Sequence, residues 1–319
     1  MEKAFTTFLL TLLWLHYVMV NSDMTQTNIT TDQLALLYLK SQIISDPFHF
    51  FNESWPPATS VCHWVGVTCG SRHQRVKSLH LSNMALTDRI PRELGNLTFL
   101  VSLDMERNNF HGNLPQEMTH LHRLKFLNLS FNRFSGEVPS WFGLLHQLQV
   151  LNLGNNSFTG SIPSSFSNIS KLETLNLKLN SIEGQIPKVI GILSIQVNQL
   201  MGSIPFTIFN ISRIKVIAFV ENSLSGYLPY GLCNDLSIIK GLYLSTNKLR
   251  GHMPTNLSSC SQLQILSLSD NEFDGPIHSE IGRLSNLQML YLGFNHFKGI
   301  FLSYECSYVI ASKFYFITQ

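Results

Sequence analysis

The stretch LNLSFNRFSGEVP (127–139) is followed at the same spacing by LNLGNNSFTGSIP (151–163) and LNLKLNSIEGQIP (175–187). The pattern precedes them in LDMERNNFHGNLP (103–115) and continues, with variations, to LYLGFNHFKGIF (290–301). A fixed period of this length is typical of solenoids, in which each copy forms one turn. The sequence therefore predicts about ten stacked turns over residues 76–300, each dependent on its neighbours for stability.

One asparagine closes the LxLxxN motif of each copy. Successive asparagines are 24 or 25 residues apart, except for one interval of 18. An amide side chain both donates and accepts, so a stack of them can satisfy backbone groups that the bend after each strand leaves unpaired. We expect a structural ladder formed by Asn108, Asn132, Asn156, Asn180, Asn198, Asn222, Asn247, Asn271 and Asn295.

The other repeated letters have equally local roles. Alternation in LxL directs the leucines into the solenoid and the residues between them outward, as in a short strand. The glycine tolerates a positive φ for the next bend, and the proline, which has no N–H, ends local pairing. The residues that follow return along the outer side.

One repeat is short. From Pro163 to Asn180 the chain takes 17 residues, but from Pro187 to Asn198 it takes 11. Six residues of the outer path are missing, through a gene-model error, which we favour, or a tolerated short turn. Either origin predicts a defect or kink near residues 188–198, where hydrogen exchange would open first.

Composition and the chain ends narrow the class of protein. Lys and Arg number 22 against 20 Asp and Glu, and the net charge of +2 excludes the basic surface of a nucleic-acid binder. Lys3 and the apolar run 8–20 predict a signal peptide over residues 1–22 and hence an extracellular protein. No other stretch reaches the roughly 18 apolar residues of a membrane span. Residues 301–319 form an aberrant tail without the repeat.

Residues 31–69 read TDQLALLYLKSQIISDPFHFFNESWPPATSVCHWVGVTC, and LxxLxxLxLxxNxLxGxIP describes the repeat. The first resembles the N-terminal cap of plant leucine-rich-repeat receptor-like kinases, and the second resembles their plant-type repeat. The resemblance implies a cap over residues 23–75 and a right-handed, horseshoe-like α/β superhelix. A parallel inner β-sheet would be covered outside by short helical or 3-10 segments. The sequence of the repeats most resembles the branch of this family that contains immune receptors for microbial patterns.

The resemblance implies a module that binds a peptide or protein ligand outside the cell, in immune or developmental signalling. No glycine-rich phosphate loop, HRD, DFG, GxSxG or HExxH motif is present, so we expect neither catalysis nor a cofactor in this chain. Such receptors also pair with a co-receptor kinase through membrane-proximal repeats, which this sequence lacks. It therefore reads as an ectodomain truncated before the membrane helix and kinase. It would be secreted to the apoplast as written, or lie at the plasma membrane in a full-length receptor.

Two alternatives stay open. The chain is also similar to secreted polygalacturonase-inhibiting proteins, which share the ten-repeat length and the LxGxIP motif. Those proteins carry extra cysteines at both caps, whereas this chain has none before Cys62. The third interpretation is a fragment of a longer receptor kinase without a function of its own.

The cysteines of the cap are implied to form a disulfide between Cys62 and Cys69 in an oxidising compartment. His63 and His73 flank them, but we favour the disulfide over a zinc site. We expect Cys233 and Cys260, one repeat plus a few residues apart, to be buried thiols rather than a bridge.

Two further candidate sites, a cysteine in the tail and an EF-hand-like segment, have little support in the sequence. Cys306 in the tail is expected to be a free thiol. The acidic residues of 270–275 imitate the start of an EF-hand loop, but Ile281 occupies the position of the required glutamate, so no metal site is predicted.

Glycosylation sequons occur at eight asparagines, Asn28, Asn52, Asn96, Asn128, Asn155, Asn168, Asn210 and Asn256. Those at 96, 168 and 210 each lie five residues after a repeat proline, so their sugars would line one outer ridge. Those at 128 and 155 fall in or beside a strand, where sugars would shield the inner surface of turns three and four.

The outward positions of the inner strands form the predicted binding surface. By alternation they include His80, Asp104, Glu106, Arg107, Phe126, Phe131, Lys178, Glu221, Tyr243, Asp270, Tyr291 and Phe294. Exposed aromatic and charged side chains on a rigid concave face suit peptide or protein recognition, although ordinary solvated strand residues would look the same. We favour Tyr243, Asp270, Tyr291 and Phe294, on turns eight to ten, as ligand-binding residues. Asp104, Glu106 and Arg107 form a second, polar patch.

Overall fold

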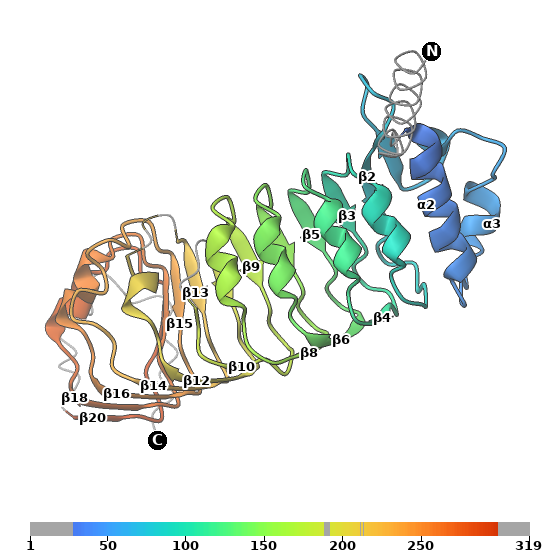
Figure 1. Ribbon diagram of the computed structural model, residues 1–319. Helices are drawn as coiled ribbons and strands as arrows, with labels where there is room; N and C mark the ends of the chain where they lie inside the picture. The colour runs from blue at the N-terminus through green and yellow to red at the C-terminus, as the bar shows by residue number, and fades with distance from the viewer. Residues whose placement is uncertain (1–27, 188–191, 211, 213, 299–319) are drawn as a thin grey trace, which may run out of the picture.

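The computed structural model describes residues 28–187, 192–210, 212 and 214–298. The chain winds into an elongated, curved solenoid with the N-terminal cap at one end (Figure 1). The predicted parallel inner sheet with short 3-10 helices outside is confirmed. The predicted signal peptide (1–22), the tail (301–319) and Cys306 lie outside the described residues.

The cap consists of helices α2 (Ile29–Gln42) and α3 (Phe50–Ser54), the 3-10 helix η1 (Val61–His63) and strand β1 (Val67–Cys69). Strand β1 runs antiparallel to β2 (Val76–His80), the first strand of the repeats. Trp55 and Trp64 are buried and stacked, with ring centroids 5.0 Å apart. These rings and the apolar face of α2 cover the hydrophobic end that the first turn would otherwise expose to water.

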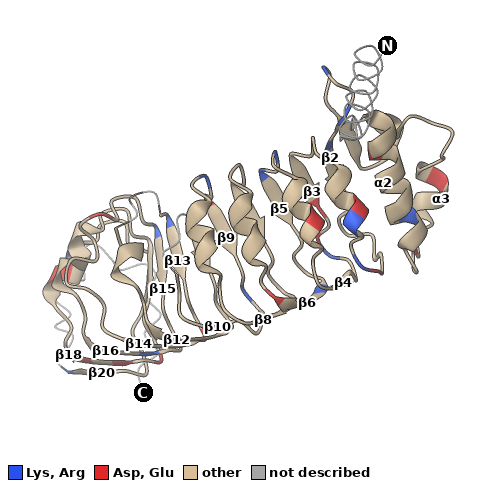
Figure 2. Ribbon diagram, in the orientation of Figure 1, with Lys and Arg blue, Asp and Glu red and all other residues tan. Residues whose placement is uncertain are grey.

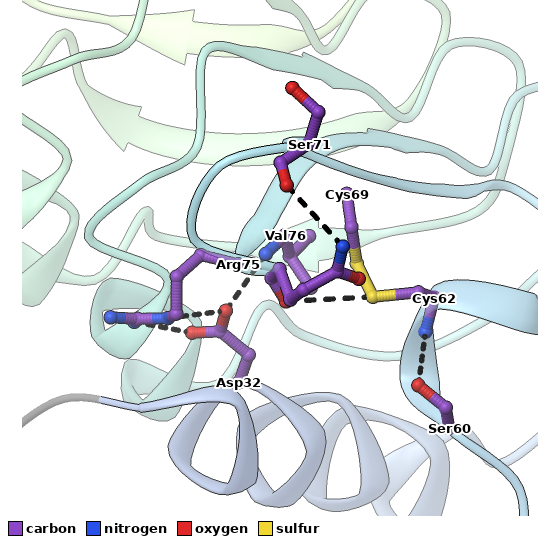
Figure 3. Close-up of a disulfide and its surroundings, with 8 residues drawn as sticks. Asp32, Ser60, Cys62, Cys69, Ser71, Arg75 and Val76 are labelled. Atoms are coloured by element: carbon purple, nitrogen blue, oxygen red, sulfur yellow. Dashed lines mark hydrogen bonds and ion pairs between the residues drawn. A yellow bond between two sulfur atoms is a disulfide. The ribbon is translucent and has the colours of Figure 1, made fainter.

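A buried ion pair joins the cap to the first repeat strand (Figure 3). The Asp32 side chain on α2 is fully buried and accepts hydrogen bonds from the Arg75 guanidinium at 2.7 and 2.8 Å. It also accepts the Val76 backbone N–H at 2.8 Å. Cys62 and Cys69 form a disulfide beside this pair, which leaves neither sulfur available for zinc. The disulfide therefore closes the cap on itself, whereas the charged contact and packing hold the cap to the first repeat strand.

Among the described residues, eleven strands form the main sheet, and all neighbours after β1–β2 pair in parallel. The register advances by one repeat per strand, because the same LxL segment recurs in each turn. The strands that follow β2 are β3 (Ser102–Asp104), β5 (Phe126–Asn128), β7 (Val150–Asn152), β9 (Thr174–Asn176), β11 (Ile192–Ser194), β13 (Val216–Ala218), β15 (Gly241–Tyr243), β17 (Ile265–Ser267) and β19 (Met289–Tyr291).

A second set of short parallel strands follows the ladder asparagines and lies along one edge of the solenoid (Figure 1). The sequence pattern had predicted only a bend there. One group is β4 (His111–Gly112), β6 (Arg133–Glu137) and β8 (Ser157–Thr159). The other is β10 (Glu183–Gly184), β12 (Gln199–Ser203), β14 (Ser223–Gly226), β16 (Lys248–His252), β18 (Glu272–Pro276) and β20 (His296–Lys298).

Short 3-10 helices form the third side of most of the described turns. All but η8, which follows His278, begin one residue after the repeat proline, whose fixed φ and extended ψ redirect the chain. Their bounds are η2 (Arg92–Asn96), η3 (Gln116–His120), η4 (Ser140–Leu144), η5 (Ser164–Asn168), η6 (Phe206–Ile208), η7 (Thr255–Ser259) and η8 (Ser279–Arg283). One buried hydrophobic residue of each helix completes the core between the sheets.

The core consists of columns of identical positions. Both apolar residues of each LxL motif are buried, except the half-buried Leu292 of the last copy. Where phenylalanine stands two residues after the ladder asparagine in adjacent copies, the rings stack. Phe134 lies 6.4 Å from both Phe110 and Phe158, centroid to centroid. Because each side chain packs chiefly on its copies in adjacent turns, the core extends along the whole solenoid and has no single centre.

The ladder asparagines point inward in one aligned column. Asn156 is representative: its Oδ1 accepts the Phe134 N–H at 3.0 Å, and its Nδ2 donates to the Leu129 and Leu153 carbonyls, both at 3.0 Å. The same pattern recurs at the other ladder positions from Asn108 to Asn295. Each amide thereby bonds its own turn to the preceding one.

The shortened turn leaves the inner sheet intact. Strand β11 pairs in parallel with both β9 and β13, and Asn198 donates to Leu177 and accepts from Ile182 as a ladder residue should. Its partners are 21 and 16 residues back, against 27 and 22 for Asn156. Strand pairing and the ladder therefore continue through this turn on the concave side, so the missing residues come from the outer path. The outer part of this turn includes residues 188–191, outside the described residues.

The prediction that Cys233 and Cys260 are free thiols is wrong, because the two form a disulfide with Cα atoms 5.1 Å apart. The two cysteines are 27 residues apart, which is more than one repeat, so their sulfur atoms would be out of line if both turns followed the same local path. Cys260 caps η7, whereas the segment around Cys233 is folded as turns. The different path of the Cys233 segment brings its sulfur beside the next turn.

Candidate functional site: the concave sheet face

The outward side chains of the main sheet form rows that run across successive turns. The row one residue before each ladder asparagine has a left-handed backbone at every full copy, with φ between 54° and 56°. These residues are Arg107, Phe131, Asn155, Leu179, Val197, Glu221, Thr246, Asp270 and Phe294. The left-handed bend turns the asparagine that follows into the interior, and it is unfavourable for residues other than glycine, asparagine and aspartate. Sequence reasoning named five of these residues as outward positions but missed their shared left-handed backbone, which their fixed position before the asparagine marks.

The predicted polar patch on turn two is held together by its own contacts. Asp104 accepts the Glu106 backbone N–H at 3.1 Å, and Glu106 accepts from Asn128 at 3.0 Å and lies 3.4 Å from Arg107. The Arg107 guanidinium also lies over the Phe131 ring, 4.8 Å from its centroid. The structure thus brings the three predicted residues together, with partners that a ligand would have to replace.

Asn128 is a poor site for a sugar in this structure. Its side chain is buried, its Nδ2 donates to Glu106, and its Oδ1 accepts from the Ser130 hydroxyl at 2.7 Å. N-glycosylation uses that amide nitrogen. The expected glycan shield over turns three and four therefore loses one of its two attachment points, because a strand-facing position was buried by its neighbours.

The other sequons lie in mixed surroundings. Asn96 and Asn168 are exposed at the last residue of their 3-10 helices, and Asn210 is exposed at the equivalent point. Asn155 is half-buried in the left-handed row. Asn256 is half-buried, donates to Asn234 and leaves its Oδ1 without a partner among the described residues. Asn28 caps α2 and Asn52 lies exposed on α3.

The favoured residues on turns eight to ten form two neighbouring pairs. Tyr243, Ser267 and Tyr291 are in register on β15, β17 and β19, so the two tyrosines flank a serine at a Cα separation of about 10 Å. Asp270 and Phe294 occupy adjacent positions of the left-handed row, and 52% of the Phe294 surface is exposed. The four predicted residues therefore lie on one continuous part of the face.

The tyrosine rings lean along their own strands. A Cβ atom on Gly241 would lie 2.6 Å from the Tyr243 ring, so this ring covers the glycine two residues before it. The Tyr291 hydroxyl lies 3.5 Å from the Met289 sulfur, again two residues back. Burial raises the pKa of the Tyr243 hydroxyl, and the neighbouring Tyr291 raises it further. The protonated Tyr243 hydroxyl can donate as well as accept a hydrogen bond.

The floor between these rings is small or apolar. Ile265 on β17 is half-buried, and the Ser267 hydroxyl is paired with that of Ser245 at 2.6 Å. An inserted side chain could contact an aromatic ring on each side at about 4.5–7 Å. The arrangement is therefore suited to gripping one apolar group of an extended ligand, with the Asp270 carboxylate nearby.

Charge is sparse along the central turns, which are mostly tan in Figure 2. The described residues contain no cluster of three or more His, Cys, Asp or Glu side chains in metal-binding geometry. Of the described helices, none has both the length and the hydropathy that a bilayer span requires.

Comparison with known proteins agrees with this architecture. A leucine-rich repeat N-terminal domain model matches residues 29–70, a leucine-rich repeat region model matches 71–190, and a single leucine-rich repeat matches 262–284. The LRR receptor-like serine/threonine-protein kinase EFR of Arabidopsis thaliana is 42% identical over 80 residues, which are 25% of this chain and 8% of that protein. Polygalacturonase inhibitor 2 of the same plant is 32% identical over 105 residues, 32% of this chain and 30% of that protein.

Among solved structures, the ectodomain of the Arabidopsis thaliana receptor kinase GASSHO1/SCHENGEN3, in complex with CASPARIAN STRIP INTEGRITY FACTOR 2, superposes with a TM-score of 0.77. It is 32% identical and covers 83% of this chain, which matches 33% of that ectodomain. The chain thus spans a minor part of the length of the relatives it matches, and that part carries no kinase domain. With its cap, ladder and repeats, this chain belongs to the leucine-rich-repeat proteins and is homologous to the ectodomains of plant leucine-rich-repeat receptor-like kinases.

Proposed function

We propose that this chain recognises an extended extracellular peptide, or a peptide segment of a protein, on the concave face of turns eight to ten. The observation that carries the proposal is the pair Tyr243 and Tyr291, flanking Ser267 in register on alternate strands. Exposed aromatic residues on a rigid scaffold contribute large contact areas at little cost in conformational entropy. The plant peptide hormone receptor RGFR1, solved in complex with RGF2 and 28% identical to this chain, supports this class of ligand.

The site favours a ligand with one apolar or aromatic side chain and one basic group. The apolar side chain would enter between the tyrosine rings, over Ile265. The basic group would pair with the exposed Asp270 or with Glu221, which lies two turns earlier in the left-handed row. An acidic ligand would instead meet carboxylates of its own sign.

Signalling roles follow from the homologues. We place the chain outside the cell, as the ectodomain part of a receptor acting in immunity or development. Pairing with a co-receptor kinase would require the membrane-proximal repeats that this sequence lacks. Inhibition of a polygalacturonase is the second function, favoured by the 32% identity with polygalacturonase inhibitor 2. A pectinase assay with the purified chain separates the two, because an inhibitor lowers the rate and a peptide receptor does not.

The direct test screens the purified chain against a displayed library of random peptides. We expect enriched sequences to combine an apolar or aromatic residue with Lys or Arg. Tyr243→Ala combined with Tyr291→Ala should weaken a selected peptide at least about tenfold, equal to about 1.4 kcal/mol. Tyr230→Ala is the matched control, since this tyrosine is 77% exposed but lies on the outer path, next to Pro229. Equal affinity for the double variant and the control would refute the proposal.

A further inference from the structure

A groove of about 720 Å³ lies on the flank of the solenoid, away from the concave face. It sits where the second-sheet strands of turns two to four give way to the 3-10 helices. Its volume is within the roughly 300–1,000 Å³ of small-molecule sites. The same loop positions of three successive turns line it, so the groove follows the axis of the repeats.

One wall is aromatic. Trp141, the second residue of η4, is half-buried against Phe142, with ring centroids 4.4 Å apart. It lines the groove between Pro139 and Pro163. Its indole N–H has no hydrogen-bond partner among the described residues, and it is not buried. The ring thus offers both an apolar surface and a free donor.

The other walls carry polar groups without partners. Asn113, Glu137, Ser140, Ser161 and Ser164 line the groove, and within the described part of the chain none of their side chains forms a hydrogen bond. In contrast, the Ser165 hydroxyl is used, because it donates to the Ser140 carbonyl at 2.6 Å and fixes the floor. The groove therefore offers hydroxyl, amide and carboxylate groups that a polar ligand could satisfy.

The backbone is shaped to place these side chains. Gly136 has φ +83°, and a Cβ atom there would lie 2.5 Å from the Asn113 Oδ1. The Asn113 amide thus lies over Gly136 of the next turn, and any side chain at position 136 would displace this amide. Glu137, one residue further on, is the one charged residue that lines the groove.

From this geometry we propose that the flank groove is a binding site for a neutral oligosaccharide. A sugar ring has an apolar face of C–H groups, which suits the Trp141 ring, and a rim of hydroxyls that both donate and accept. The density of short polar groups in the groove matches that rim, and the single carboxylate of Glu137 can accept two hydroxyls. The absence of basic groups among the lining residues disfavours acidic sugars.

Tryptophan fluorescence gives a specific readout. Of the tryptophans in the described residues, Trp55 and Trp64 are 0% and 2% exposed, so Trp141 alone can report on a surface ligand. The glycosylated chain, secreted from insect cells, is titrated with cellotriose, maltotriose and triacetylchitotriose, with trigalacturonic acid as the acidic comparison. We expect one neutral trisaccharide to shift the emission and the acidic one to bind at least tenfold more weakly.

Calorimetry with the same trisaccharide tests the residues. Trp141→Ala should lower affinity at least tenfold, and Trp141→Phe, which preserves packing on Phe142, should lower it less. Glu137→Gln keeps the shape and should weaken binding severalfold. Tyr230→Ala, on the outer path of another turn, should change nothing. The Tyr243 and Tyr291 double variant should also bind the sugar normally, which separates this proposal from the concave-face proposal.

Enzymatic removal of the N-glycans distinguishes the sources of the sugar. If the groove holds a glycan of the chain itself, deglycosylation will shift Trp141 emission and expose trisaccharide binding that was absent before. If it takes free oligosaccharide, binding will be the same before and after. No response to any neutral trisaccharide in either form, up to concentrations that reveal a Kd of about 1 mM, overturns the proposal. So does a loss of peptide affinity in Trp141→Ala, because the groove would then serve peptide recognition.

Discussion

Replacing one ladder residue, Asn156→Ala, is predicted to destabilise the whole solenoid. The substitution removes the acceptor of the Phe134 N–H and the donors that reach Leu129, Leu153 and Gly154 at 3.0, 3.0 and 3.3 Å. Phe134 is fully buried, and its N–H has no other acceptor among the described residues, so this group is left unsatisfied. Alanine leaves the neighbouring sequon at Asn155 intact.

The size of the destabilisation depends on which hydrogen-bond partners of Asn156 keep another hydrogen bond after the substitution. The Leu129 carbonyl keeps its bond from Asn132 at 3.1 Å, and the Leu153 carbonyl keeps its bond from Asn180 at 3.1 Å. Only the Phe134 N–H loses its sole partner, which costs about 1–3 kcal/mol, and the weakened carbonyl contacts add about 1 kcal/mol. We expect the free energy of unfolding to fall by about 2–4 kcal/mol.

The assay is urea unfolding followed by circular dichroism, together with hydrogen exchange of the Phe134 amide, in protein made without N-glycans. Asn168→Ala is the control, since this asparagine is exposed on η5 of the same region. The control should shift stability by less than about 0.5 kcal/mol. If Asn156→Ala shifts stability no more than the control, and the Phe134 amide stays protected, the ladder does not hold the turns together as argued.

Four other changes test separate parts of the structure. Asp32→Asn leaves a buried guanidinium without its carboxylate and should cost about 3–5 kcal/mol in thermal or urea unfolding. Cys233→Ser with Cys260→Ser opens a loop with a sequence separation of 27 and should cost about 3–4 kcal/mol, whereas equal stability would contradict a structural disulfide. Thr246→Asn relieves a β-branched residue at φ 56° and should add about 0.5–1 kcal/mol in calorimetry, while Thr246→Val should add nothing. Since the pKa of Tyr243 is raised on folding, its contribution to stability is complete below the unfolded pKa of about 10 and is lost as pH rises through the folded value. Ultraviolet titration at alkaline pH should show a tyrosine that ionises above the ordinary value of about 10, and Tyr243→Phe should remove that step.

Much of the fold was predictable because it is periodic. The spacing of Asn132, Asn156 and Asn180, with the leucines before them, fixes a strand, an inward bend and a stacking repeat in every copy. Each of these features depends on a residue and its copies one turn away, so a single sequence already contains both partners. The outward position of the candidate site residues was predictable for the same reason, since alternation along a strand places Tyr243 and Tyr291 on its outer face.

The features that the sequence did not reveal depend on contacts between different loop positions. The Cys233–Cys260 disulfide forms because one outer segment takes a path unlike its neighbours. Asn128 is buried because Glu106 and Ser130 close over it. The second sheet and the flank groove arise where side chains of one turn cross the glycine of the next. The repeat period determined which residues would stack, but only the tertiary structure decided how far each loop deviates from the average turn, because burial and bonding there depend on neighbours that periodicity does not specify.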